Sequence, residues 1–258
     1  MERARELIKP YLEKDGVIGV YVVGSATRPY RDELSDYDIE VIVEDDVYDS
    51  TPMDERQVFS FKEGEPKVVD YEFYLIPWSD FVGLRHSTLD LFHYSFQHAV
   101  ILHDPEGRIE PIIRQLAELP DDVRTERMTV HFLEFLYRLR RARKTANRGE
   151  LPINLALLQG NALSSLAKLI FLAKGSWPST VHWSEQEFDQ LGISNDLLDL
   201  VKAWMLDPSS DNARALVGAV REFLDGAGEI FHQDMDGIQQ WLFFTKEGKA
   251  AFERWGCR

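Results

Sequence analysis

Hydrophobic and polar residues alternate in two different ways along this chain. Up to about residue 110, apolar residues come in short runs rich in β-branched side chains and separated by polar turns, which is typical of strands. The expected strands are 17–23, 39–43 and 99–103, and a hairpin of 57–61 and 67–76. Short helices are expected over 3–14, from Trp78 onward, and on either side of the last strand.

Beyond Glu110 the apolar residues recur at spacings of three and four, which predicts helices. One such series begins at Phe132 and frays near Gly149, and a second covers 155–173. A third helix is expected over 212–224. We therefore predict an α/β (α+β) protein, with a mixed β-sheet flanked by helices in an N-terminal domain, 1–114, and an all-helical bundle in a C-terminal domain, 115–258.

A further helix start is predicted from a local motif. Ser184 is followed three residues later by Glu187, which is the spacing of a capping box. In that motif the serine would be the N-cap.

Composition indicates a folded protein outside the membrane. The chain has 258 residues, of which 44% are hydrophobic, and no unbroken apolar run approaches the length of a membrane span. The charged N-terminus lacks a signal-peptide core, so we expect a cytoplasmic protein. Cys257 is the lone cysteine, which excludes an internal disulfide, and an oligomer is compatible with the sequence.

The net charge of −15 bears on partners. An acidic surface repels phosphate backbones, so we expect no broad nucleic-acid surface, although a local basic groove is not excluded. The same charge would favour a small cationic substrate, and it would equally serve solubility.

Two aspartates provide the main chemical signal. Asp36 and Asp38 adjoin the strand 39–43, and residues two apart on a strand face the same side, with Cα atoms about 6.6 Å apart. Carboxylate oxygens are ligands that Mg²⁺ prefers, and two such ions can stabilise both oxygens of a displacement at phosphorus. We therefore expect a magnesium site, with two ions, at this pair.

Gly24 and Ser25 follow the buried strand 17–23 and are expected to bind phosphates. Glycine lets the backbone approach an anion closely, and the serine hydroxyl adds a donor. Arg28 and Arg31 lie between this pair and the aspartates, where guanidinium groups could meet the same phosphates. Solvated loop charges are an equally good interpretation of the two arginines.

A third carboxylate is expected on the neighbouring strand. Asp70 and Glu72 alternate with Val69, Tyr71 and Phe73, so the two acids are expected on one face. Either one could complete the metal site or act as the general base that takes the proton from the attacking hydroxyl.

Together these residues resemble the signature of the DNA polymerase β-like nucleotidyltransferase superfamily: a strand, Gly-Ser, a spacer of ten residues, then Asp-x-Asp on a second strand. The resemblance is specific over 17–43 and weaker over 67–76, where the family carries its third acid. It implies transfer of a nucleoside monophosphate, with Mg²⁺ and ATP.

The helical second half resembles, by layout, the antibiotic branch of that superfamily, the aminoglycoside and lincosamide nucleotidyltransferases. This resemblance implies antibiotic resistance as a role and a small hydroxylated, cationic acceptor. It also makes Glu134 a candidate catalytic acid and Lys144 a candidate nucleotide contact, although helix-surface charges are the more common interpretation of both.

Other functions remain open at this stage. The acceptor could be a protein, as in toxin–antitoxin systems, or an RNA end. A non-catalytic nucleotide sensor is a further alternative that would keep the fold.

Overall fold

The computed structural model describes residues 1–149, 152–179, 183–226 and 235–256. Cys257 therefore lies outside the described residues. The chain forms two compact units, Met1–Glu118 and Leu119–Arg258. We call them the sheet unit and the helical unit.

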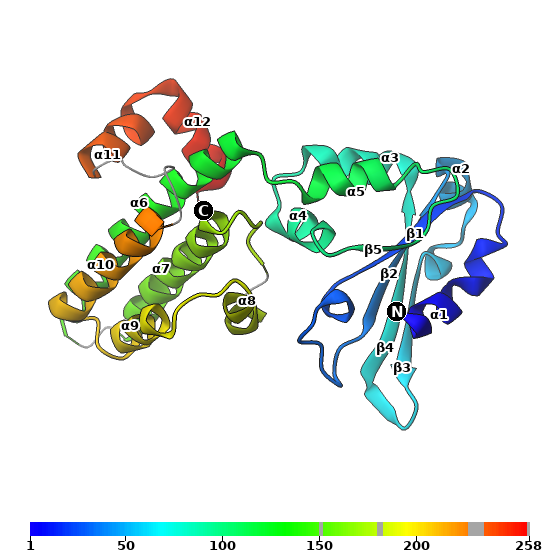
Figure 1. Ribbon diagram of the computed structural model, residues 1–258, viewed down its shortest axis with the longest axis horizontal. Coiled ribbons are helices and arrows are strands. Elements are labelled where there is room, and N and C mark those ends of the chain that lie inside the picture. The colour runs from blue at the N-terminus through cyan, green and yellow to red at the C-terminus, as the bar shows by residue number, and fades with distance from the viewer. Residues whose placement is uncertain (150–151, 180–182, 227–234, 257–258) are drawn as a thin grey trace. The chain divides into compact units, whose positions relative to one another are not determined.

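A five-stranded mixed sheet organises the sheet unit (Figure 1). The strands are β1 (Val17–Val23), β2 (Tyr37–Val43), β3 (Gln57–Lys62), β4 (Glu65–Pro77) and β5 (Val100–His103). Their order is β3-β4-β2-β1-β5; β1 is antiparallel to both β2 and β5, β2 is parallel to β4, and β3 is antiparallel to β4. The predicted α/β class is thus confirmed.

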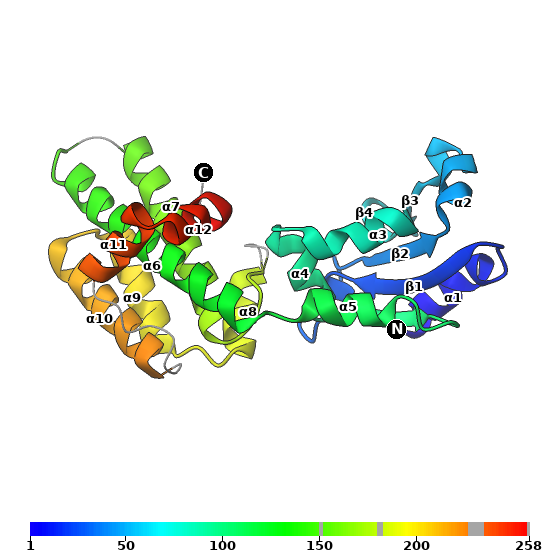
Figure 2. The same cartoon turned by 90° about the horizontal axis from the view of Figure 1, so that it is seen from above.

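Helices cover both faces of this sheet. They are α1 (Glu2–Leu12), α2 (Asp45–Ser50), α3 (Trp78–Gly83), α4 (Asp90–Phe96) and α5 (Glu110–Ala117), with 3₁₀ turns at Ser25–Thr27, Met53–Glu55 and Leu84–His86. The two central strands carry buried apolar residues on both faces because each face is covered: Val20 and Ile39 pack towards α1, whereas Tyr21 and Ile42 pack with Phe81 on the other side. Figure 2 shows α3 and α5 running along the strands.

The pairing of β3 with β4 is interrupted near Asp70. Ser60 lies opposite Tyr71, but the next residue, Phe61, lies opposite Val69. One residue of β3 is therefore matched by two steps of β4, and Asp70 is the extra residue of a β-bulge. A bulge changes the direction of side chains along a strand, so the simple alternation expected from the sequence does not hold at this point.

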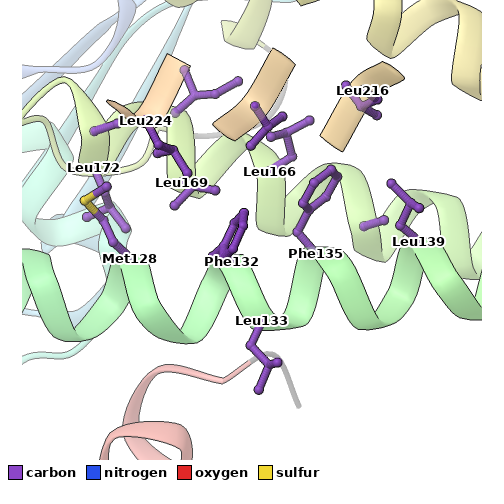
Figure 3. Close-up of a cluster of buried hydrophobic side chains, with 14 of the residues drawn as sticks. Met128, Phe132, Leu133, Phe135, Leu139, Leu166, Leu169, Leu172, Leu216 and Leu224 are labelled. Carbon is purple, nitrogen blue, oxygen red and sulfur yellow. The ribbon is translucent and has the colours of Figure 1, made fainter. Parts of the chain in front are cut away.

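The helical unit is built around two long helices, α6 (Asp121–Ala146) and α7 (Pro152–Ala173). Phe132, Phe135 and Leu139 of α6 point towards Leu166 and Leu169 of α7, as Figure 3 shows. Further helices pack around this pair: α8 (Ser184–Gln190), α9 (Asn195–Leu206), α10 (Ser210–Gly226), α11 (Met235–Phe244) and α12 (Lys246–Trp255). This is the helical bundle that the three-and-four spacing predicts.

Two details differ from the sequence prediction. The N-cap of α8 is Trp183, and Ser184 is already the first helical residue, so the capping-box prediction was wrong. The second detail concerns α7, which is long and apolar enough to cross a membrane by length and composition, with a mean hydropathy of 1.5 over its most apolar window. Its C-terminal half is buried against α6, as in the core helix of a bundle.

Candidate functional site

Strand pairing brings the Gly-Ser turn to the aspartate pair. Val23, the last residue of β1, lies opposite Asp38 in β2, so the chain leaves β1 where β2 begins. Asp38 is the second residue of β2, and Asp36 directly precedes the strand. The two segments that the sequence singled out, although ten residues apart, therefore lie side by side.

Gly24 makes the closest approach in this region. Its φ is +72°, and a Cβ added there would lie 1.9 Å from Oδ2 of Asp38. Any side chain would thus collide with the carboxylate as well as strain the backbone. Gly24, which the sequence predicts to let the backbone approach a phosphate, therefore also makes room for the carboxylate of Asp38.

Ser25 begins a tight 3₁₀ turn directly after Gly24. The Gly24 carbonyl accepts hydrogen bonds from the backbone N–H of Thr27 at 3.3 Å and from its hydroxyl at 2.9 Å. The Arg28 N–H donates to the Ser25 carbonyl at 3.0 Å. These bonds hold the turn in place next to the aspartates.

Glu72 is the third carboxylate that the sheet places beside the pair. The parallel register of β2 and β4 sets Glu72 opposite Asp38. The hydroxyl of Tyr74 donates a hydrogen bond to the Glu72 carboxylate. Desolvation and this contact with Glu72 raise the pKa of Tyr74 to about 12, so the phenol stays protonated and remains a donor.

The electrostatics of the site are concentrated on Asp38. Burial, and after it the charges of Asp36, Glu72 and Glu40, together raise the pKa of this carboxyl from 3.8 to about 7. Several negative charges at one partly desolvated site favour the binding of either a proton or a cation. The four carboxylates therefore form one electrostatic cluster, which we call the carboxylate cluster.

Glu40 is a member of this cluster that the sequence interpretation missed. It is two residues beyond Asp38 on β2 and accepts a hydrogen bond from the hydroxyl of the fully buried Tyr21 on β1. Burial raises the pKa of Glu40, and the bond from Tyr21 partly offsets the shift. The signal was present, because Asp36, Asp38 and Glu40 continue the same alternation along the strand.

Asp70, the other candidate on β4, has a different partner. Its carboxylate forms an ion pair with Arg3 of α1 at 3.0 Å. It is not among the carboxylates that raise the pKa of Asp38. The structure therefore groups Glu72, and not Asp70, with the aspartate pair.

Arg28 and Arg31 contact tyrosine rings. The buried Arg28 guanidinium lies 4.3 Å from the ring centroid of Tyr94 and donates to the Tyr94 carbonyl at 3.4 Å. Arg31 lies over the ring of Tyr37, at 4.8 Å, and donates to its hydroxyl at 3.0 Å. Tyr37 and Asp38 alternate along β2, so this contact holds Arg31 on the side opposite to Asp38.

Glu134 and Lys144 belong to α6 of the helical unit. Glu134 is buried, with His131 Nδ1, Arg138 and Ser165 each at 3.4 Å from its carboxylate. It is thus a core residue of the bundle and not the helix-surface charge that was the more common interpretation. Lys144 is exposed and lines a basic pocket on the same helix.

The donor set of the carboxylate cluster suits a hard divalent cation. Within the part of the chain that the structure describes, no three His, Cys, Asp or Glu side chains form a ready-made metal cage. Mg²⁺ is commonly held by one or two carboxylates and completes its shell with waters and substrate phosphates. Oxygen donors whose partial burial and mutual repulsion raise the pKa of Asp38 to about 7 match that mode of binding.

Comparisons with known proteins find a similar family model and similar solved structures. A family model described as "Domain of unknown function (DUF4037)" matches residues 87–184. The chain is also similar to the crystal structure of a nucleotidyltransferase-like protein from Exiguobacterium sibiricum 255-15, with 18% identity and a TM-score of 0.46 over 97% of this chain and 77% of that chain. No curated protein matches. Neither description names an acceptor or an antibiotic.

Proposed function

We propose that this protein is a magnesium-dependent nucleotidyltransferase, which transfers a nucleoside monophosphate, AMP from ATP, to a hydroxyl of a small molecule. One observation carries the proposal: burial and the neighbouring carboxylates raise the pKa of Asp38 to about 7 directly beside the Gly24–Ser25 turn. A strongly perturbed acid beside a turn suited to phosphates is typical of a site that catalyses transfer at phosphorus.

In this proposal Asp36 and Asp38 hold Mg²⁺, and Glu72 is the third carboxylate. The cation supplies charge neutralisation at the triphosphate. Ser25 donates its hydroxyl to a phosphate oxygen. Because the contacts of Arg28 and Arg31 are with tyrosines, the proposal gives neither arginine a direct role.

The reaction exchanges one P–O bond for another. The acceptor oxygen forms a bond to the α-phosphorus, the bond from that phosphorus to the β-phosphate oxygen breaks, and pyrophosphate leaves. The acceptor proton passes to Glu72, which is beside Asp38 and oriented by the bond from Tyr74.

The acceptor side of the site is aromatic and acidic. Phe59 of β3 lies opposite Glu72, is 47% exposed and meets the ring of Tyr74 edge-on, at 6.4 Å between centroids. Aromatic faces and carboxylates together favour a cationic molecule. An acceptor of the aminoglycoside type fits this chemistry, and the proposal extends to antibiotic modification on that ground.

The test is a pyrophosphate-release assay on the full chain. Purified protein is supplied with Mg²⁺, each nucleoside triphosphate in turn, and a panel of hydroxylated acceptors that includes aminoglycosides and neutral sugars. We expect pyrophosphate release that depends on the acceptor, is highest with ATP, and falls by at least about 100-fold in Asp36→Asn.

Three outcomes contradict parts of the proposal. Undiminished turnover in Asp36→Asn would contradict the proposal that Asp36 binds Mg²⁺. Labelled polypeptide formed from labelled ATP in a lysate, with no small acceptor modified, moves the function to protein modification. ATP binding without pyrophosphate release under any condition identifies a sensor.

A further inference from the structure

A basic pocket in the helical unit has no role in the proposed reaction. It has a volume of about 730 Å³ and lies between the C-terminal part of α6 and the N-terminal part of α7. Its lining residues are Tyr137, Arg140, Arg141, Lys144, Thr145, Arg148, Asn154, Leu157 and Leu158. Four of these nine side chains are cations and none is an acid.

The part of the chain that supplies the pocket cations is positively charged, whereas the whole chain is negatively charged. Between Glu134 and Glu150 the sequence has six Lys and Arg residues and no Asp or Glu, although the net charge of the protein is −15. The α6 dipole favours cations in its last turn, where Arg143 and Lys144 lie. It does not account for Arg140 and Arg141, which precede that turn.

The pocket cations differ in their partners from two other exposed cations of this unit. On the described surface of the helical unit, Lys202 pairs with Asp199 and Arg214 pairs with Asp211. No carboxylate in the described part of the chain pairs with Arg140, Arg141, Lys144 or Arg148. Their positive charge is therefore available to a ligand.

One of the cations is already held in place. Arg141 donates to the hydroxyl of Tyr137 at 2.6 Å, and its guanidinium lies 4.4 Å from the centroid of the same ring. A guanidinium fixed in this way loses less conformational entropy when it binds an anion. Tyr137, Leu157 and Leu158 add an aromatic and apolar surface to the same pocket.

We propose that this pocket binds a small organic anion that carries two or more phosphate groups. Its volume falls in the usual range for small-molecule sites, about 300–1,000 Å³. From Arg140 to Lys144 the helix rises about 6 Å at 1.5 Å per residue, and Arg148 follows just beyond the helix end, so the cations are spread enough to meet several phosphates of one molecule. The apolar side chains would contact the organic part. The residues of this pocket all belong to the helical unit and include none of the carboxylate cluster, so the proposal does not depend on the proposed reaction.

The first experiment is a titration calorimetry measurement with the full chain in EDTA, using inorganic tripolyphosphate as the probe. We expect the double variant Arg140→Gln/Lys144→Gln to bind the probe at least about tenfold more weakly than the unmodified protein. The matched control, Lys202→Gln/Arg214→Gln, removes two exposed cations elsewhere in the helical unit and should change the affinity by less than about twofold. Equal weakening in both variants, or none in the pocket variant, overturns the proposal.

A second experiment separates this site from the sheet unit. Asp38→Asn and Ser25→Ala should retain the tripolyphosphate affinity in EDTA, even if both have lost nucleotide transfer. A loss of probe binding in either variant would place the anion at the Gly-Ser turn and refute the pocket. Circular dichroism on every variant establishes that the helical unit is folded.

Three further ligands distinguish the class of molecule. ATP in EDTA should bind more tightly than tripolyphosphate, because its organic part adds contact with Tyr137. Tighter binding to a single-stranded RNA than to ATP, with a steep salt dependence, would overturn the small-molecule assignment in favour of nucleic acid. Binding only to vesicles of anionic lipid would overturn it in favour of a membrane surface.

Discussion

Replacing Asp38 with asparagine should have opposite effects on stability and on turnover. The pKa of Asp38 is raised from 3.8 to about 7 by burial and by Asp36, Glu72 and Glu40. An acid whose pKa is higher in the folded state than in the unfolded state costs stability once the pH exceeds the unfolded value, and the full cost is reached above the folded value. Without metal, the substitution should therefore stabilise the protein at pH 8 and have almost no effect near pH 3.8.

The size of the effect follows from the shift. A rise from 3.8 to about 7 is roughly three pKa units, and about 1.4 kcal/mol for each unit gives an upper limit of about 4 kcal/mol. The carboxylate is part-exposed, and water and relaxation of neighbouring charges reduce this value. We expect Asp38→Asn to raise the free energy of unfolding by about 1–3 kcal/mol at pH 8 in EDTA.

The assay is urea unfolding of the full chain at pH 5 and pH 8, in EDTA and in Mg²⁺. The matched control is Asp54→Asn, which removes one exposed carboxylate of the same unit and should leave the unfolding free energy within about 0.5 kcal/mol of the unmodified protein. Mg²⁺ should stabilise the unmodified protein and not Asp38→Asn, since a ligand stabilises only a state that binds it.

Two results would refute this reasoning. If Asp38→Asn is less stable than the unmodified protein at pH 8 in EDTA, the carboxylate is not electrostatically strained. If Mg²⁺ stabilises both proteins equally, Asp38 does not hold the cation.

Three further predictions concern neighbouring residues and the helical core. Glu72→Gln should lower kcat/KM for nucleotide transfer at least about 100-fold, whereas Asp70→Asn, which removes only the ion pair with Arg3, should leave it within about threefold; the reverse order would exchange their roles. Gly24→Ala should cost about 2–4 kcal/mol in urea unfolding, because its Cβ would meet Asp38, and a neutral effect would contradict the close approach. Phe132→Ala should cost about 3–5 kcal/mol in helix unfolding followed by circular dichroism, and a loss below about 1 kcal/mol would argue against its place in the core.

Much of the fold could be predicted because the hydrophobic pattern reflects burial directly. The expected strand 17–23 coincides with β1, since an apolar, β-branched run bounded by Gly24 leaves little freedom. By contrast, α9 and α12 were not predicted. Each begins at a side-chain N-cap, Ser194 for α9 and Thr245 for α12, which is a local signal that the sequence interpretation did not use.

The sequence predicted those parts of the candidate site that depend on the spacing of residues along the chain. It did not predict those that depend on how one strand pairs with another. The alternation of Asp36 and Asp38 and their nearness to Gly24 follow from two strands joined by one turn. The choice between Asp70 and Glu72 required the register of β2 with β4 and the bulge at Asp70, which depend on long-range contacts. Glu40 required knowledge of Tyr21 on a different strand.

Every residue of the carboxylate cluster, together with Gly24 and Ser25, lies within Met1–Glu118. Substitutions in α6 to α12 therefore replace none of these residues and none of the strands that carry them. The helical unit can diversify over evolutionary time while the carboxylates keep their mutual spacing. Among relatives of this chain, we expect the residues of the bundle, and the ligand preference of its basic pocket, to vary more than the residues at the junction of β1 and β2.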